Sequence, residues 1–112
     1  MKVTGTGGKE YTIKPDANLR DTNLSKASLE GPDLADAYLD EANLMDTNLS
    51  KANLEWASLS GASLYRAYLI RADLSDVCLS GADLTNANLS DAVWNDGTVF
   101  PEGFESPDEL RG

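Results

Sequence analysis

The side chains that could attack a substrate are serines and one cysteine, and the chain lacks the base that usually activates them. It contains no histidine, which excludes the serine–histidine and cysteine–histidine arrangements of hydrolases. No lysine stands in an evident base role. Cys78 is the only cysteine, so an intramolecular disulfide and a thiolate metal cage are excluded as well. We therefore expect no enzymatic activity.

Two further groups of residues suggest ligand binding, and neither completes a known pattern. The glycine-rich segment 5–8, GTGG, lacks the lysine and the following helix of a phosphate-binding loop. The pairs Asp33/Asp36 and Asp73/Asp76 offer oxygen ligands for a hard cation, but their spacing is not that of an EF-hand. We expect neither a cofactor nor a metal site.

The charge balance narrows the classes of partner. The 112 residues contain 9 Lys+Arg against 19 Asp+Glu, a formal net charge of -10. Nucleic acids and anionic membranes attract basic surfaces, so direct binding to either is disfavoured. The first residues lack the apolar stretch of a secretory signal. We expect a cytoplasmic protein that meets other proteins.

Most of these candidate residues lie within a strict repeat that has leucine at every fifth position. A small residue, usually alanine, lies two positions before each leucine, and a small polar residue often lies between them. Residues 17–96 form sixteen consecutive units of this kind, with Trp94 at the last leucine position. The leucines are Leu19, Leu24, Leu29, Leu34, Leu39, Leu44, Leu49, Leu54, Leu59, Leu64, Leu69, Leu74, Leu79, Leu84 and Leu89.

A period of five fits neither a regular helix nor a long strand. On a helix it would distribute the leucines around the whole cylinder, and a strand requires a period of two. Self-similarity at a fixed period is instead typical of solenoids, in which each unit buries its apolar residues against its neighbours. The frequent Asn, Asp, Ser and Gly residues favour turns.

The triplets Ala52-Asn53-Leu54 and Ala82-Asp83-Leu84 resemble the repeat of the pentapeptide-repeat family. This resemblance implies an all-β fold, a right-handed quadrilateral β-helix of about four coils, with the leucine and the small residue pointing inward. At ~4.8 Å per coil, the tower would be about 19 Å tall. We divide the chain into an N-terminal cap (1–16), the β-helix (17–96) and a C-terminal cap or tail (97–112).

The caps are expected to cover the open ends of the solenoid. Tyr11 and Ile13 alternate before Pro15, and Asp96-Gly97 is a turn signal that ends the repeat. The hydrophobic residues expected to fold over the last coil are Val99, Phe100, Phe104 and Leu110.

A square coil of twenty residues stacks outward side chains in columns. The column of Lys26, Asp46 and Arg66 alternates in sign and predicts ion pairs. One face carries six carboxylates, a tryptophan and no base, and we call it the acidic face. Its residues are Asp33, Asp36, Glu55, Trp56, Asp73, Asp76 and Asp96. Another region, which we call the apolar patch, combines Met45, Tyr65, Tyr68 and Ile70.

The acidic face has two interpretations, a solubilising surface or a docking surface. The hypothesis we adopt is a non-enzymatic scaffold that binds a protein partner, expected to be basic, through this face. The chain itself is expected to be a monomer or a weak dimer.

The alternative hypothesis is mimicry of DNA. Some pentapeptide-repeat proteins resemble duplex DNA in width and charge and act on DNA gyrase, so the resemblance implies a possible regulator of a topoisomerase. Duplex DNA carries one charge per ~1.7 Å, about 11 over the expected height. The acidic face carries six, which weighs against mimicry.

Overall fold

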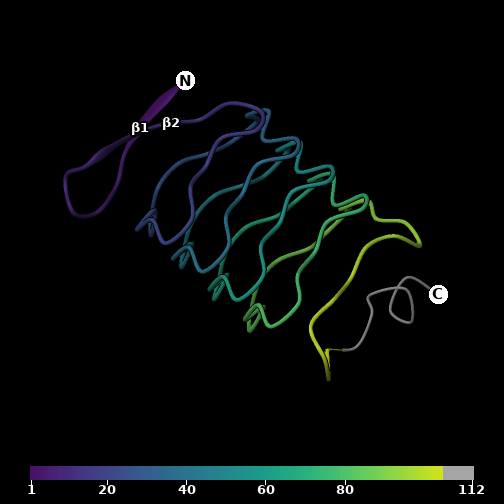
Figure 1. The fold of residues 1–112 in the computed structure, drawn as a ribbon. Coiled ribbons are helices and arrows are strands. Elements are labelled where there is room, and N and C mark those ends of the chain that lie inside the picture. Colours follow the sequence, from purple (N-terminus) through teal and green to yellow (C-terminus); the bar gives the residue numbers. More distant parts are fainter. Residues whose placement is uncertain (105–112) are drawn as a thin grey trace.

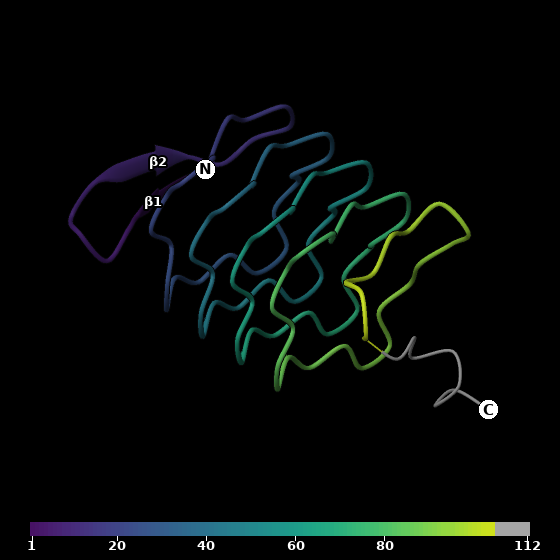
Figure 2. The same ribbon diagram turned by 60° about the horizontal axis from the view of Figure 1, so that its bottom comes forward.

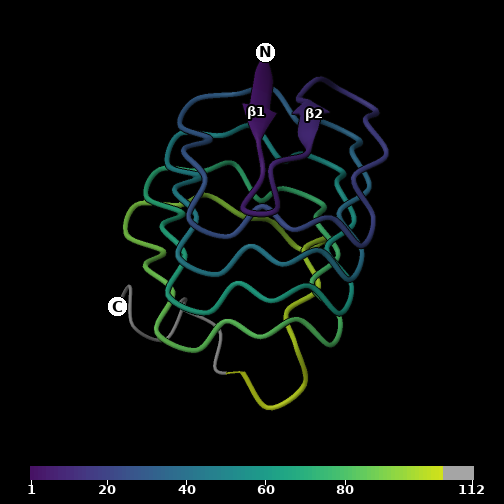
Figure 3. The ribbon, with the colours of Figure 1, turned by 90° about the vertical axis from the view of Figure 1, so that its left-hand side faces the viewer.

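The chain winds into a stack of square coils behind an N-terminal hairpin (Figures 1 and 2). The computed structural model describes residues 1–104, and the molecule measures 42 × 22 × 20 Å. Figure 3 looks nearly along the stack and shows the coils lying over one another around a common interior. Within residues 1–104, no helix has the length and apolar character needed to cross a bilayer.

Parallel backbone pairing holds each coil to the next. Leu19 donates its amide to the Tyr38 carbonyl at 2.7 Å, and the Tyr38 amide returns a bond to Ala17 at 2.9 Å. The same two-bond pattern recurs on all four sides, with bridge partners twenty residues apart. Residues with the same place in successive coils therefore stack in columns, as the sequence predicts.

A tight turn closes each unit, and its geometry explains the period of five. Except at Pro32, the amide after each turn bonds back to the leucine carbonyl, as from Ala37 to Leu34 at 3.0 Å. The second residue after the leucine has a positive φ in all fifteen units from Asp21 to Asp91, between 57° and 79°. These features define a type II turn. Three residues span the side of the square, and two form its corner.

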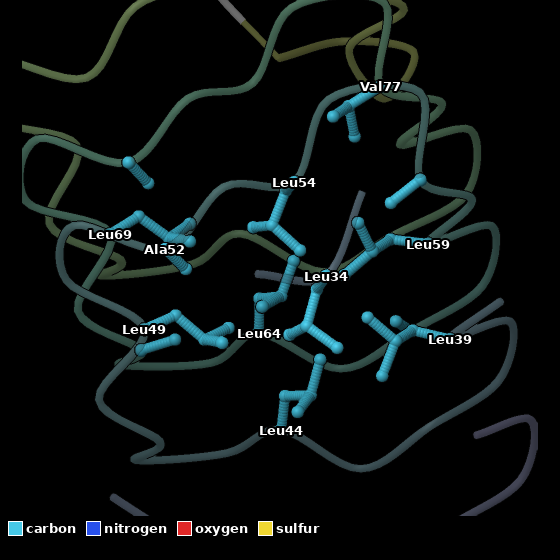
Figure 4. Packing of buried hydrophobic residues seen from close by; sticks show 14 of the residues in the cluster. Leu34, Leu39, Leu44, Leu49, Ala52, Leu54, Leu59, Leu64, Leu69 and Val77 are labelled. Atoms are coloured by element: carbon cyan, nitrogen blue, oxygen red, sulfur yellow. The ribbon is translucent and has the colours of Figure 1, made fainter. Parts of the chain in front are cut away.

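The interior contains little besides leucines and small residues. The twelve leucines from Leu24 to Leu79 are almost completely inaccessible to solvent. In Figure 4, Leu39 and Leu59 approach the centre from one side and Leu49 and Leu69 from the opposite side. The inward orientation that the family resemblance implies is confirmed for these positions.

Polar residues at inward positions are hydrogen bonded to the backbone. The hydroxyl of Thr47 donates to the Leu24 carbonyl at 2.8 Å, and that of Thr22 donates to the Leu19 carbonyl at 2.7 Å. Pro32 is buried at an equivalent position. It has no amide hydrogen, so its corner lacks the usual turn bond.

Asparagine and aspartate before the leucine stabilise the side of the square. Their Oδ1 accepts the amide hydrogen two residues ahead, as Asn53 does from Glu55 at 3.0 Å. All nine residues of these types at this position in units 17–91 make the bond, at 2.9 to 3.3 Å. A side-chain acceptor thus satisfies an amide at the start of these nine corners, which explains the preference for Asn or Asp beside leucine.

One of these carboxylates predicts an acid-sensitive contribution to stability. The hydroxyl and the amide of Thr85 donate to Asp83 and hold the pKa of its carboxyl below the ordinary 3.8. A lowered pKa in the folded state stabilises the protein above the unfolded-state pKa, and this contribution is lost as the pH falls through the folded-state value. The free energy of unfolding of Asp83→Asn should therefore fall less on acidification than that of the wild type. Parallel pH curves for the two proteins would contradict the assignment.

Residues 1–16 form a hairpin at the first coil. Strands β1 (Lys2–Thr4) and β2 (Glu10–Thr12) pair antiparallel, with Val3 opposite Tyr11. The loop between them contacts the coil edge, where the Thr6 hydroxyl donates to the Ser25 carbonyl at 2.7 Å. Gly5 is buried there, and a Cβ on it would collide with the Asn23 carbonyl. Ile13 is buried and joins the core.

At the other end, the backbone pairing continues past the last leucine unit, but the spacing between paired residues changes. Val99 pairs with Cys78 at a spacing of twenty-one residues, because the turn at 96–97 adds one residue. The expectation that Val99 folds over the last coil is therefore wrong, since its pairing turns the side chain outward with 48% exposed. Phe100 and Phe104 do pack against the core, and Phe100 contacts the Trp94 ring edge-on. Leu110 lies outside the described residues.

Candidate functional site

The structure brings most of the acidic face together in adjacent columns. Asp33, Asn53 and Asp73 are successive bridge partners on one side of the square. At the following corner, Asp36 donates its amide to the Glu55 carbonyl and Trp56 donates its amide to the Ser75 carbonyl. This places Asp36, Trp56 and Asp76 in one corner column, with Glu55 beside them.

Two of these carboxylates also have a structural role. Asp33 accepts the amide hydrogen of Ala35 at 3.1 Å, and Asp73 accepts that of Ser75 at 3.0 Å. Asn53 lies between them and donates its side-chain amide to Asp33 at 3.3 Å. These bonds come from neutral donors, so none of them brings a positive charge to the acidic face.

Asn95 is a member of this surface that the sequence reasoning missed. Its Nδ2 donates to the Asp76 carboxylate at 3.1 Å, and its Oδ1 accepts the Asp76 amide at 3.0 Å. The Asp76 carboxylate also lies against Gly97, where a Cβ would collide with it. The sequence did contain a signal for this contact, because Asn95 follows Asp76 by nineteen residues, one fewer than the twenty residues of a full coil. Asp96 lies in the turn that changes the spacing between paired residues, so the backbone pairing does not extend the corner column to it.

The ion pairs of the described residues lie outside the acidic face. Within residues 1–104, the ion pairs are Lys2–Glu10 at 3.7 Å, Arg20–Asp40 at 3.8 Å and Arg66–Asp46 at 3.0 Å. The last confirms one half of the ladder predicted for the column of Lys26, Asp46 and Arg66, whereas Lys26 forms no ion pair with a described carboxylate. None of these ion pairs includes a carboxylate of the acidic face.

The nearest basic residues follow from the repeat. Lys51 precedes Asn53 by two residues, and Arg71 precedes Asp73 by two residues. Both therefore lie at the corner where this side of the square begins, whereas Trp56 lies at the corner where it ends. Neither forms an ion pair with a described carboxylate. The acidic face therefore has a basic margin on one side and Trp56 on the other.

Neutralising this face should not damage the fold. In Asp73→Asn/Asp76→Asn, the new amide oxygens can accept the same bonds, as Asn53 already does from Glu55. We expect the free energy of unfolding to stay equal or to rise slightly at low salt, because like-charge repulsion is removed, with the gain disappearing near 1 M salt. Chemical denaturation at two salt concentrations measures this. Asp73→Ala, which lacks the acceptor, should instead lose about 1 kcal/mol. An equal loss in the asparagine variant would show that the charge itself is structural.

The other sequence candidates are less concentrated. In the apolar patch, Tyr68 is 49% exposed, while Met45, Tyr65 and Ile70 are half-buried. Cys78 is a free, half-buried thiol whose Sγ lies 3.3 Å from the Ser60 hydroxyl. Over residues 1–104, no three carboxylate, cysteine or histidine side chains come close enough to hold a metal ion.

Comparisons with known proteins agree with this architecture. Among curated proteins, no sequence matches the chain. The crystal structure of a pentapeptide repeat protein from Nostoc Pcc 7120 is 39% identical, covers 80% of this chain and 70% of its own, and has a TM-score of 0.69. A pentapeptide repeat protein from the Arabidopsis thaliana thylakoid lumen is 28% identical, with 88% and 74% covered and a TM-score of 0.78.

These likenesses confirm the predicted all-β fold, a right-handed β-helix. The family model for pentapeptide repeats matches eight copies over residues 16–50 and 52–91, which is more than half of the chain. The protein therefore belongs to the pentapeptide repeat family.

Proposed function

We propose that this protein is a non-enzymatic scaffold whose acidic face docks a basic protein partner. The observation that carries the proposal is the separation of charge. On other faces, the Asp40 and Asp46 carboxylates each pair with an arginine of the same chain. Those of the acidic face do not, so their charge is available to a cation from outside.

The rigidity of the fold supports this role. Each coil is bonded to its neighbours on four sides, so the spacing of outward side chains is set by the backbone and not by flexible loops. Binding to such a surface requires little ordering of the protein. The partner expected here presents lysine or arginine side chains along an extended segment.

A DNA-mimic regulator of a topoisomerase such as DNA gyrase is the second candidate. The 22 × 20 Å cross-section, close to the width of duplex DNA, favours it. The six carboxylates of the acidic face remain too few to match the charge of a DNA duplex as tall as the expected four-coil tower. Scaffolding accounts better for a face that combines six carboxylates with no basic residue.

A capture experiment with matched variants tests the proposal. The acidic-face variant carries Asp33→Asn, Asp36→Asn, Glu55→Gln, Asp73→Asn and Asp76→Asn. The control variant carries five changes of the same net charge at exposed positions elsewhere, namely Asp16→Asn, Asp21→Asn, Glu30→Gln, Asp83→Asn and Asp91→Asn. Each protein is immobilised and exposed to a cell lysate.

A partner that the wild type and the control variant retain, and the acidic-face variant loses, supports docking on this face. Equal retention by all three proteins would mean that the face only solubilises the molecule. A gyrase subunit among the proteins lost would favour the second candidate over the first.

A further inference from the structure

Trp56 occupies a position that does not suit its size. It is 63% exposed and lies at a corner with φ 64°. Bulky residues rarely adopt this left-handed conformation, and an indole in water gains nothing from burial. The fold needs no tryptophan here, because other corners use Asp, Lys or Gly.

Three of the four tyrosine rings lie beneath a cation of the same chain. The Arg20 guanidinium lies 4.2 Å from the centre of the Tyr38 ring, and that of Arg66 lies 4.9 Å from the centre of Tyr65. The Lys9 ammonium lies 5.8 Å from the centre of Tyr11. In the described part of the chain, no such cation lies over Trp56, although indole is the strongest aromatic acceptor of a cation.

The surroundings of Trp56 also select for positive charge. Asp36 and Asp76 lie one coil to either side in its column, and Glu55 precedes it. The side-chain donor to the Asp76 carboxylate is the neutral amide of Asn95 and not a cation. Tyr68, the other outward ring without a described cation, lies instead between Asn48 and Asn88. Among the described residues, an outward ring without a cation of the same chain and neighbouring negative charge therefore coincide only at Trp56.

We propose that Trp56, with Asp36, Glu55 and Asp76, binds an arginine side chain of the basic partner. The planar guanidinium stacks on the indole while its edge donates hydrogen bonds to the flanking carboxylates. Arginine is favoured over lysine because an ammonium is a compact, strongly hydrated charge without a plane to stack. This inference rests on the proposed function and specifies the chemistry of the partner.

The test uses two probes, an octa-arginine and an octa-lysine peptide, titrated calorimetrically into the full chain at fixed salt. The wild type should bind the arginine peptide more tightly. Trp56→Gly, which suits the left-handed corner, should weaken arginine binding by about three- to tenfold and abolish the preference over lysine. Trp56→Phe should keep part of the preference. Tyr68→Leu, the matched control, should change neither affinity. Circular dichroism verifies that each variant is folded.

The outcomes separate this inference from the proposed function. Suppose that Trp56→Gly binds both peptides like the wild type while Asp36→Asn/Asp76→Asn weakens the binding of both. The acidic face then binds cations without help from Trp56, so the arginine site is refuted while the proposed docking function stands. If the wild type binds neither peptide, or the carboxylate variant binds like the wild type, both fail.

Discussion

Replacing Leu54 with alanine is expected to lower the free energy of unfolding by about 2–5 kcal/mol. Leu54 is completely buried, and it meets the leucines of the other three sides at the centre of the tube (Figure 4). The backbone of each side is bonded to the coils above and below, so the walls cannot move inward to fill the void. Most of the cavity should therefore remain, and the loss of free energy of unfolding should not be reduced by relaxation of the walls.

Chemical denaturation of Leu54→Ala and Leu89→Ala tests this expectation. Leu89 has the same place in the repeat but is only partly buried, in the last leucine-centred coil. Its truncation should cost clearly less. A loss below about 1 kcal/mol for Leu54→Ala would be inconsistent with a close-packed leucine core.

The opposite change, Ala62→Leu, is expected to destabilise the protein by about 1–3 kcal/mol. Ala62 is fully buried beside the leucine stack, and the same pairing that prevents collapse also prevents expansion. Ala87→Leu, at a partly buried position near the end, is the matched control and should cost less. If Ala62→Leu is as stable as the wild type, the interior has spare volume and the alternation of one large and one small side chain is not required.

The family resemblance that the repeat carries was sufficient to predict the direction of nearly every inward side chain, because it implies a narrow square tube with the leucine and the small residue pointing inward. It also predicted the columns, so the proximity of Asp36, Trp56 and Asp76 followed from their spacing of twenty. Val99 is the instructive failure. One extra residue at the 96–97 turn lengthened the spacing between paired residues from twenty to twenty-one. The apolar side chain of Val99 suggested burial, but the backbone pairing places it at an outward position.

Other features depended on geometry that residue types do not reveal. The left-handed corner was not predicted, because only Gly31, Gly61 and Gly81 signal it and most corners carry charged residues. The contact between Asn95 and Asp76 depends on where the repeat ends. The absence of a described cation over Trp56 became meaningful only beside Tyr38 and Tyr65, whose rings are covered.

The most direct test of the central claim is a map of where a basic ligand touches the protein. Isotope-labelled wild type is titrated with octa-arginine at low salt, and the amide chemical shifts are followed by NMR. Docking on the acidic face predicts that the largest changes fall within residues 33–36, 53–56 and 73–76. Changes concentrated at Tyr65 and Tyr68, or spread evenly over all four sides, would contradict the claim that this face is the binding surface.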